Sequence, residues 1–142
     1  MIDGGLWNCI RDNLRGPHHQ RIESALTALG IPDVNSCLDG VEVWIELKAT
    51  DAWAVKFRPF QTGWLSRRAR AGGRTFLMVR RRREPSPRLP SCDELWIFRG
   101  ADARLVEEGG LRNAEPLLRL EGGPSQWDWE GVRDCLFRTP RD

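Results

Sequence analysis

The sequence contains no tyrosine, only two histidines and only four cysteines. We find no physical reason for the missing tyrosine. The cysteines are scattered and form no Cys-x-x-Cys pair, so their spacing fits neither a zinc site, nor an iron–sulfur cluster, nor a dense disulfide framework. We expect four reduced, mostly buried thiols. His18 and His19 stand beside Gly16-Pro17, where a surface pair is more common than a pair of metal ligands, and we assign them no function.

The sequence also lacks a long apolar run. The longest one is far shorter than the roughly 18 residues that a membrane-spanning helix requires. The segment from Met1 to Arg15 carries acidic residues and lacks the hydrophobic stretch of a signal peptide. We therefore expect a cytoplasmic protein that is neither exported nor inserted in a membrane.

Basic residues are concentrated in the first part of the chain. The net charge is only +2, but residues 1–83 hold 14 basic and 8 acidic residues, whereas residues 84–142 hold 8 and 12. The segment from Lys56 to Arg83 contains ten Lys or Arg and no acid, which is typical of a surface that binds a phosphate backbone. Charge alone favours equally a solvated basic helix followed by a flexible run from Arg80 to Arg83.

Hydrophobic periodicity predicts alternating helices and strands. Helices are expected at residues 6–15, at 22–29 (where 21–24 could instead be an edge strand), from Phe57 to a C-cap at Gly72-Gly73, and after a capping box of Ser125 and Asp128. Strands are expected at residues 34–48, 75–80, 94–99, 103–107 and, more weakly, 117–120. Three prolines in residues 84–90 predict a loop.

The region from Val34 to Lys48 predicts a hairpin, because Asp39-Gly40 favours a tight type I′ turn. If these two residues form the turn, Asp33 lies opposite Glu46. Lys48 then lies on the same face as Glu46, while Leu47 points into the core.

This pair of acids predicts a cation site. Residues directly opposite each other have Cβ atoms roughly 5 Å apart, and two carboxylates there are destabilising unless they are neutralised. Oxygen ligands with room for water suit Mg²⁺, with Mn²⁺ as a substitute. The ion would polarise a phosphate and acidify a water molecule, and Lys48 would orient that water or offset charge in the transition state. Glu-x-Lys or Pro-Asp alone is an ordinary structural feature, and only their combination with the basic segment indicates chemistry.

Two stretches, Gly30-Ile31-Pro32-Asp33 and Trp44-Ile45-Glu46-Leu47-Lys48, resemble the signature of PD-(D/E)xK nucleases. Downstream, Arg58 to Leu65 resembles the virus-type replication-repair (VRR-NUC) and Holliday junction resolvase-like branch, of which phage-encoded members come nearest. The resemblance covers about Arg21 to Arg80. It implies that Glu23 is an additional or water-mediated metal ligand and that Gln61 assists the site, although Gln61 could also be an exposed helix residue.

The resemblance implies an α/β, restriction-endonuclease-like fold with an αβββαβ core, which is a mixed sheet flanked by helices. A C-terminal extension of β-strand and helix would follow. We expect a single nuclease domain over residues 1–142, with the catalytic core at 1–83, a proline-rich loop at 84–91 and the extension at 92–142.

The sequence thus predicts a Mg²⁺-dependent DNA endonuclease that is selective for branched DNA such as Holliday junctions and acts as a homodimer. The expected catalytic residues are Asp33, Glu46, Lys48, Glu23 and Gln61, of which Asp33, Glu46 and Glu23 would bind the metal. Phosphate contacts are expected from Lys56, Arg58, Arg67, Arg68, Arg70 and Arg74. Two alternatives stay open: a non-catalytic nucleic-acid-binding module on the same fold, and an arginine-rich domain that binds an acidic protein.

Overall fold

The computed structural model describes residues 3–140, and its sheet contains the predicted hairpin. Asp39 and Gly40 both have positive φ, at 51° and 80°, as a type I′ turn requires. Strand β2 (Val34–Leu38) pairs antiparallel with strand β3 (Val41–Thr50), and the last residue of β2 lies opposite the first residue of β3. The predicted register is therefore confirmed.

Six strands form one mixed sheet in the order β1-β2-β3-β4-β5-β6. The other strands are β1 (His18–Arg21), β4 (Arg74–Arg83), β5 (Cys92–Arg99) and β6 (Leu118–Leu120). All neighbours are antiparallel except β3 and β4. Parallel strands need a long connection, which helix α3 (Gln61–Arg70) supplies. Helix α1 (Leu6–Asn13) precedes β1, so the predicted αβββαβ order and the mixed α/β fold class are confirmed.

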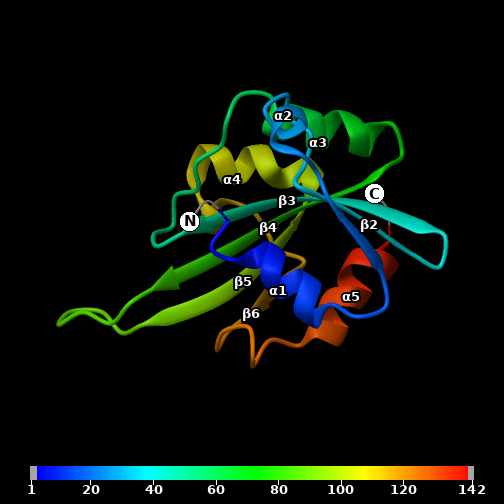
Figure 1. Cartoon of the computed structure of the whole chain (residues 1–142). Coiled ribbons are helices and arrows are strands. Elements are labelled where there is room, and N and C mark those ends of the chain that lie inside the picture. The colour runs from blue at the N-terminus through cyan, green and yellow to red at the C-terminus, as the bar shows by residue number, and fades with distance from the viewer. Residues whose placement is uncertain (1–2, 141–142) are drawn as a thin grey trace.

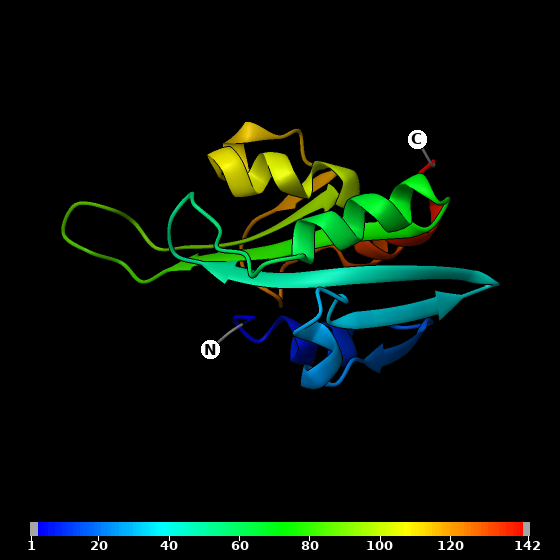
Figure 2. The ribbon, with the colours of Figure 1, turned by 90° about the horizontal axis from the view of Figure 1, so that it is seen from above.

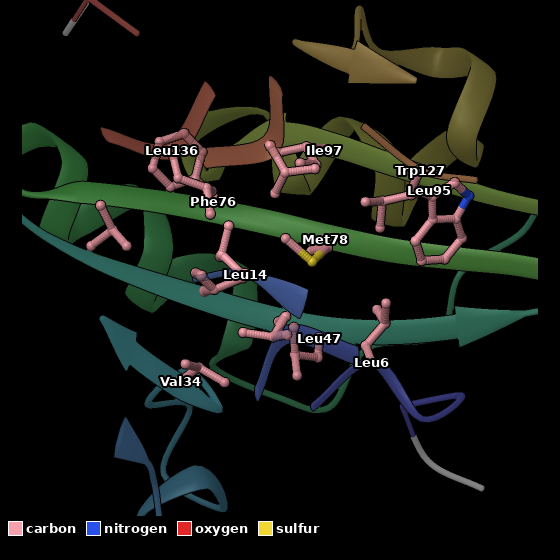
Figure 3. Close-up of a cluster of buried hydrophobic side chains, with 14 of the residues drawn as sticks. Leu6, Leu14, Val34, Leu47, Phe76, Met78, Leu95, Ile97, Trp127 and Leu136 are labelled. Carbon is pink, nitrogen blue, oxygen red and sulfur yellow. The ribbon is translucent and has the colours of Figure 1, made fainter. Parts of the chain in front are cut away.

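Helices cover both faces of this sheet (Figures 1 and 2). Helices α1 and α5 (Trp129–Arg138) pack on one face, where every second residue of β3, namely Val43, Ile45 and Leu47, is buried. Figure 3 shows part of this cluster. Helices α3 and α4 (Ala103–Gly109) pack on the other face. Because both faces are covered, β4 is apolar without interruption from Phe76 to Val79.

The predicted strand at residues 103–107 is wrong, because this segment forms helix α4. The 3-10 turn η1 (Gly100–Asp102) leads directly into it. Ala103 and Val106 are both fully buried at helical spacing, while Glu107 is exposed. Periodicity does not distinguish a strand from a helix over so short an apolar run.

Helix α3 begins at Gln61 and not at Phe57. Pro59 disfavours helical backbone at the residue before it, and Phe60 has a φ of 74°, so the first helical turn cannot extend further back. At the other end the predicted cap is confirmed, since Gly72 has a φ of 98° and the Gly73 N–H donates to the carbonyl of Arg68.

Three other predicted boundaries shift. Residues 18–21 form the edge strand β1, and only a single turn, α2 (Ser24–Thr27), is helical after it. Helix α1 ends at Asn13 and not at residue 15. The cap of α5 is Asp128, whose carboxylate accepts a hydrogen bond from the Gly131 N–H, rather than Ser125.

The arginine run at the end of β4 is ordered strand, so its interpretation as a flexible segment is wrong. Arg80 and Arg81 are buried. Their guanidinium groups pair across the sheet with Asp93 at 2.7 Å and with Glu94 at 3.0 Å. These two arginines thus hold β4 to β5, and they are not available to an anionic partner.

Within residues 3–140, no helix has the length and apolar character to cross a membrane. All four cysteines are free, as expected, but they are half-buried rather than mostly buried. His19 lies between the Ser36 hydroxyl, at 2.6 Å, and the carbonyl of Leu14, at 2.8 Å, so it joins β1 to its surroundings.

Candidate active site

Two carboxyl groups meet at the start of β2 and the middle of β3. Asp33 Oδ2 accepts a hydrogen bond of 2.8 Å from the backbone N–H of Leu47, which fixes this side chain against β3. Glu46 is only 1% exposed. Its Oε1 accepts a hydrogen bond from Gln61 Nε2 at 2.8 Å, whereas its Oε2 is buried without a hydrogen-bond partner. A buried carboxylate oxygen without a partner is costly, and a cation would satisfy it.

The acids are difficult to ionise together. Burial, and then the neighbouring Asp33 carboxylate, raises the pKa of Glu46 to about 9. Burial also raises the pKa of Asp33, against the hydrogen bond from Leu47. Two adjacent carboxyl groups in a poorly solvated site hold one proton between them unless a positive charge replaces it. This donor set therefore fits a divalent cation.

Lys48 adds a positive group on the same face of β3. Its Nζ donates a hydrogen bond of 2.7 Å to Gln61 Oε1 and lies 5.0 Å from the centre of the Phe57 ring. Burial lowers the pKa of Lys48, while the two carboxyl groups act in the opposite direction. Lys48 is thus held beside the acids by a neutral amide.

Gln61 connects these groups. Its amide nitrogen donates to Glu46, and its amide oxygen accepts from Lys48 and, at 2.7 Å, from the backbone N–H of Arg58. The residue is only 5% exposed, so its interpretation as an exposed helix residue is wrong. Because Gln61 is the first residue of α3, the start of the helix fixes the relative positions of Glu46 and Lys48.

A close approach of two loops supports this arrangement. Gly30 has a φ of 91°, and a Cβ at this position would lie 2.8 Å from the carbonyl oxygen of Phe60. Only glycine fits here without strain. The loop that leads to Asp33 therefore contacts the loop that leads to Gln61.

The carboxyl pair opens into a cleft of about 720 Å³. Asp33, Glu46, Lys48, Arg58 and Gln61 all line it, together with Glu23 and the N-terminal residues Asp3 and Trp7. A solvent-accessible cleft over buried acids leaves room for a ligand beside them.

No protein-family model matches the chain, and no curated protein matches it significantly. Among solved structures, the chain is similar to Hjc, a Holliday junction resolvase from Archaeoglobus fulgidus, with a TM-score of 0.44 and 13% identity. The match covers 92% of this chain and 91% of the resolvase. The phage origin stays a prediction.

The structure does not bring Glu23 to the other two acids. Glu23 is exposed and precedes the single turn α2, beyond the end of β1, so no strand pairing holds it over the pair. Among residues 3–140, no three His, Cys, Asp or Glu side chains are grouped closely enough to hold a metal ion. Glu23 therefore does not complete a direct three-carboxylate group, and its water-mediated role from the cleft wall stays a prediction.

The N-terminal wall of the cleft was not predicted from sequence. Asp3 caps α1 through bonds of 2.9 Å from the Gly5 N–H and 3.1 Å from the Trp7 N–H. Asp3 and Trp7 line the cleft together with Gln20 and Arg21 of β1. No spacing in the sequence relates these residues to Glu46, because only tertiary packing of α1 brings them there.

The predicted phosphate-binding residues fall into two groups. The exposed ones are Lys56, Arg58, Arg67, Arg68 and Arg70. The guanidinium carbon of Arg68 lies 4.6 Å from the centre of the Trp64 ring, which is a cation–π contact. Arg58 alone among them lines the cleft.

Arg74 is the exception, and its assignment to DNA is corrected. Its guanidinium donates to the carbonyls of Leu136, at 2.8 Å, and Thr139, at 2.7 Å. These carbonyls lie at the C-terminal end of α5, where a cation is favourable. Arg74 therefore joins β4 to α5.

Proposed function

We propose that this protein is a divalent-cation-dependent nuclease that hydrolyses phosphodiester bonds of DNA at Asp33, Glu46 and Lys48. The observation that carries the proposal is Glu46 Oε2, a buried carboxylate oxygen without a partner, next to a second poorly solvated carboxyl group in an open cleft. The pair costs stability when ionised, because burial raises the pKa of both acids and the Asp33 carboxylate raises that of Glu46 further.

The ligand chemistry favours Mg²⁺, with Mn²⁺ as a substitute. Asp33 and Glu46 offer only oxygen, and two carboxylates leave coordination positions for water and for a phosphate oxygen. When bound, the cation would supply Lewis acidity to the scissile phosphate and to an attacking water molecule.

The chain's own residues would orient the substrate and neutralise its negative charge. Lys48 would place a positive charge near the phosphoryl oxygens as negative charge develops in the transition state. Gln61 would keep Lys48 and Glu46 in register, because one amide bonds to both. Arg58, exposed on the cleft wall, would bind a neighbouring phosphate, and Glu23 would act from the same wall through water.

The substrate would be DNA held by its backbone, in keeping with the acid-free exposed face of α3, and branched rather than recognised by base sequence. A symmetric junction has two equivalent strands to cut, so the enzyme would act as a homodimer with two sites related by a two-fold axis.

The test is cleavage of four-way junction, flap, nicked and linear duplex DNA with Mg²⁺, Mn²⁺ or EDTA. Asp33→Ala and Lys48→Ala should each lower the rate by roughly a hundredfold or more. The matched control is Glu42→Ala, an exposed acid on the same strand. Activity retained in both variants would show that Asp33 and Lys48 do not form the active site. Binding without cleavage of any DNA would identify the protein as the non-catalytic module instead.

A further inference from the structure

An exposed aromatic ring stands on an unfavourable backbone directly before Gln61, which lines the cleft. Phe60 is 66% exposed and has a φ of 74°. The left-handed region is costly for a bulky residue. An exposed ring also recovers little free energy from burial. Folding alone therefore gives no reason for phenylalanine here.

The backbone of Phe60 is fixed on two sides. Its carbonyl oxygen accepts a hydrogen bond of 2.9 Å from the Trp64 N–H in the first turn of α3. On the other side it packs against Gly30, where even a methyl group would not fit. The ring is thus presented to solvent from a rigid base.

Its surroundings combine apolar and basic groups. In sequence, Phe60 lies between Arg58 and Gln61, which both line the cleft. Leu29, the neighbour of Gly30, is 64% exposed. Lys56, just before Phe60 in sequence, and the arginines of α3, just after it, are exposed, and no acid occurs from Lys56 to Arg83.

We propose that Phe60, with the exposed Leu29 on the adjoining loop, stacks on an unpaired nucleobase next to the phosphate in the cleft. The inference rests on the proposed nuclease function and names its substrate class, which is DNA with unstacked bases at a branch. A flat apolar ring bordered by cations matches a nucleotide, whose base is apolar on its faces and whose phosphate is anionic. Paired bases inside a duplex are not accessible to such a ring. A second copy of the chain fits less well, because a two-fold contact would bring like charges together.

The experiment measures binding without cleavage, in EDTA, to a splayed duplex and to a fully paired duplex of the same sequence. The splayed DNA carries 2-aminopurine at the branch. Phe60→Gly should bind the splayed DNA roughly tenfold more weakly than the wild type does, and it should bind the paired duplex with unchanged affinity. It should also lose the quenching of 2-aminopurine fluorescence. Phe60→Trp should keep both properties. The control is Leu105→Ala, an exposed apolar residue on α4.

Loss of folding would not explain such a result, because glycine relieves the positive φ and Phe60→Gly should melt no lower than the wild type. Equal binding by wild type and Phe60→Gly would overturn the inference, and so would equal losses on both DNAs. A shift from dimer to monomer in Phe60→Gly would also overturn it, by showing that the ring covers a second copy. Failure of the nuclease proposal is a separate result, since it would appear as absent cleavage while ring-dependent binding persists.

Discussion

At the scale of single residues, Glu46 destabilises the metal-free fold. Its pKa is raised from 4.5 to about 9 in the folded chain, so the folded state holds this proton more tightly than the unfolded state does. The proton on Glu46 therefore stabilises the fold. This contribution is fully present below pH 4.5, the unfolded pKa, and is lost as the pH rises through about 9, so the ionised side chain is the destabilising form.

Glu46→Gln should therefore stabilise the metal-free protein while abolishing its activity. The substitution keeps the shape and the bond from Gln61 but removes the titration. At pH 7 in EDTA we expect a gain on the order of 3 kcal/mol in the free energy of unfolding. Denaturant titrations at pH 5 and pH 8.5 should show falling stability for the wild type and constant stability for the variant. Parallel pH profiles of stability for the two proteins would show that the pKa of Glu46 is not raised in the folded state. Mg²⁺ should raise the melting temperature of the wild type only.

At the scale of elements, the site depends on two loops that touch at Gly30 and Phe60. Gly30→Ala should destabilise the protein by about 2 kcal/mol or more, because it adds a clash to an unfavourable φ. Gly72→Ala is the matched control, since Gly72 also has a positive φ but has no atom within 4 Å of the added Cβ. Equal melting temperatures for the two variants would show that the loop contact is unimportant.

The helices and strands differ in how well the sequence predicts them. Strict alternation and an Asp-Gly turn fix a hairpin register, so the placement of Asp33 opposite Glu46 is predictable from local pattern alone. The structure of residues 103–107 cannot be predicted in this way, because an apolar run of that length suits either a strand or a helix. The role of Arg74 cannot be predicted from local sequence either, because its hydrogen-bond partners lie 62 and 65 residues away.

At the scale of the whole molecule, a net charge of only +2 conceals a basic surface on α3 and its approach. Binding of DNA by such a surface releases counterions, so the affinity should fall steeply with salt. The exposed residues Arg67 and Arg70 should each contribute about one unit to the slope of log affinity against log salt.

The double variant Arg67→Gln with Arg70→Gln should thus lower that slope by about two units, measured from 50 to 200 mM salt. Arg104→Gln, an exposed arginine on α4, should leave it unchanged. A slope that does not respond to the double variant would place the DNA on another face.

The tight turn at Asp39 and Gly40 also bears on the order of assembly. The bond between Asp33 and the Leu47 N–H spans only 14 residues, so its formation costs little loop-closure entropy. Hairpins of this kind close within microseconds. The two acids can therefore meet before α1 and α3 enclose them, and a newly made chain would present the proposed cation site while most of the molecule is still unfolded.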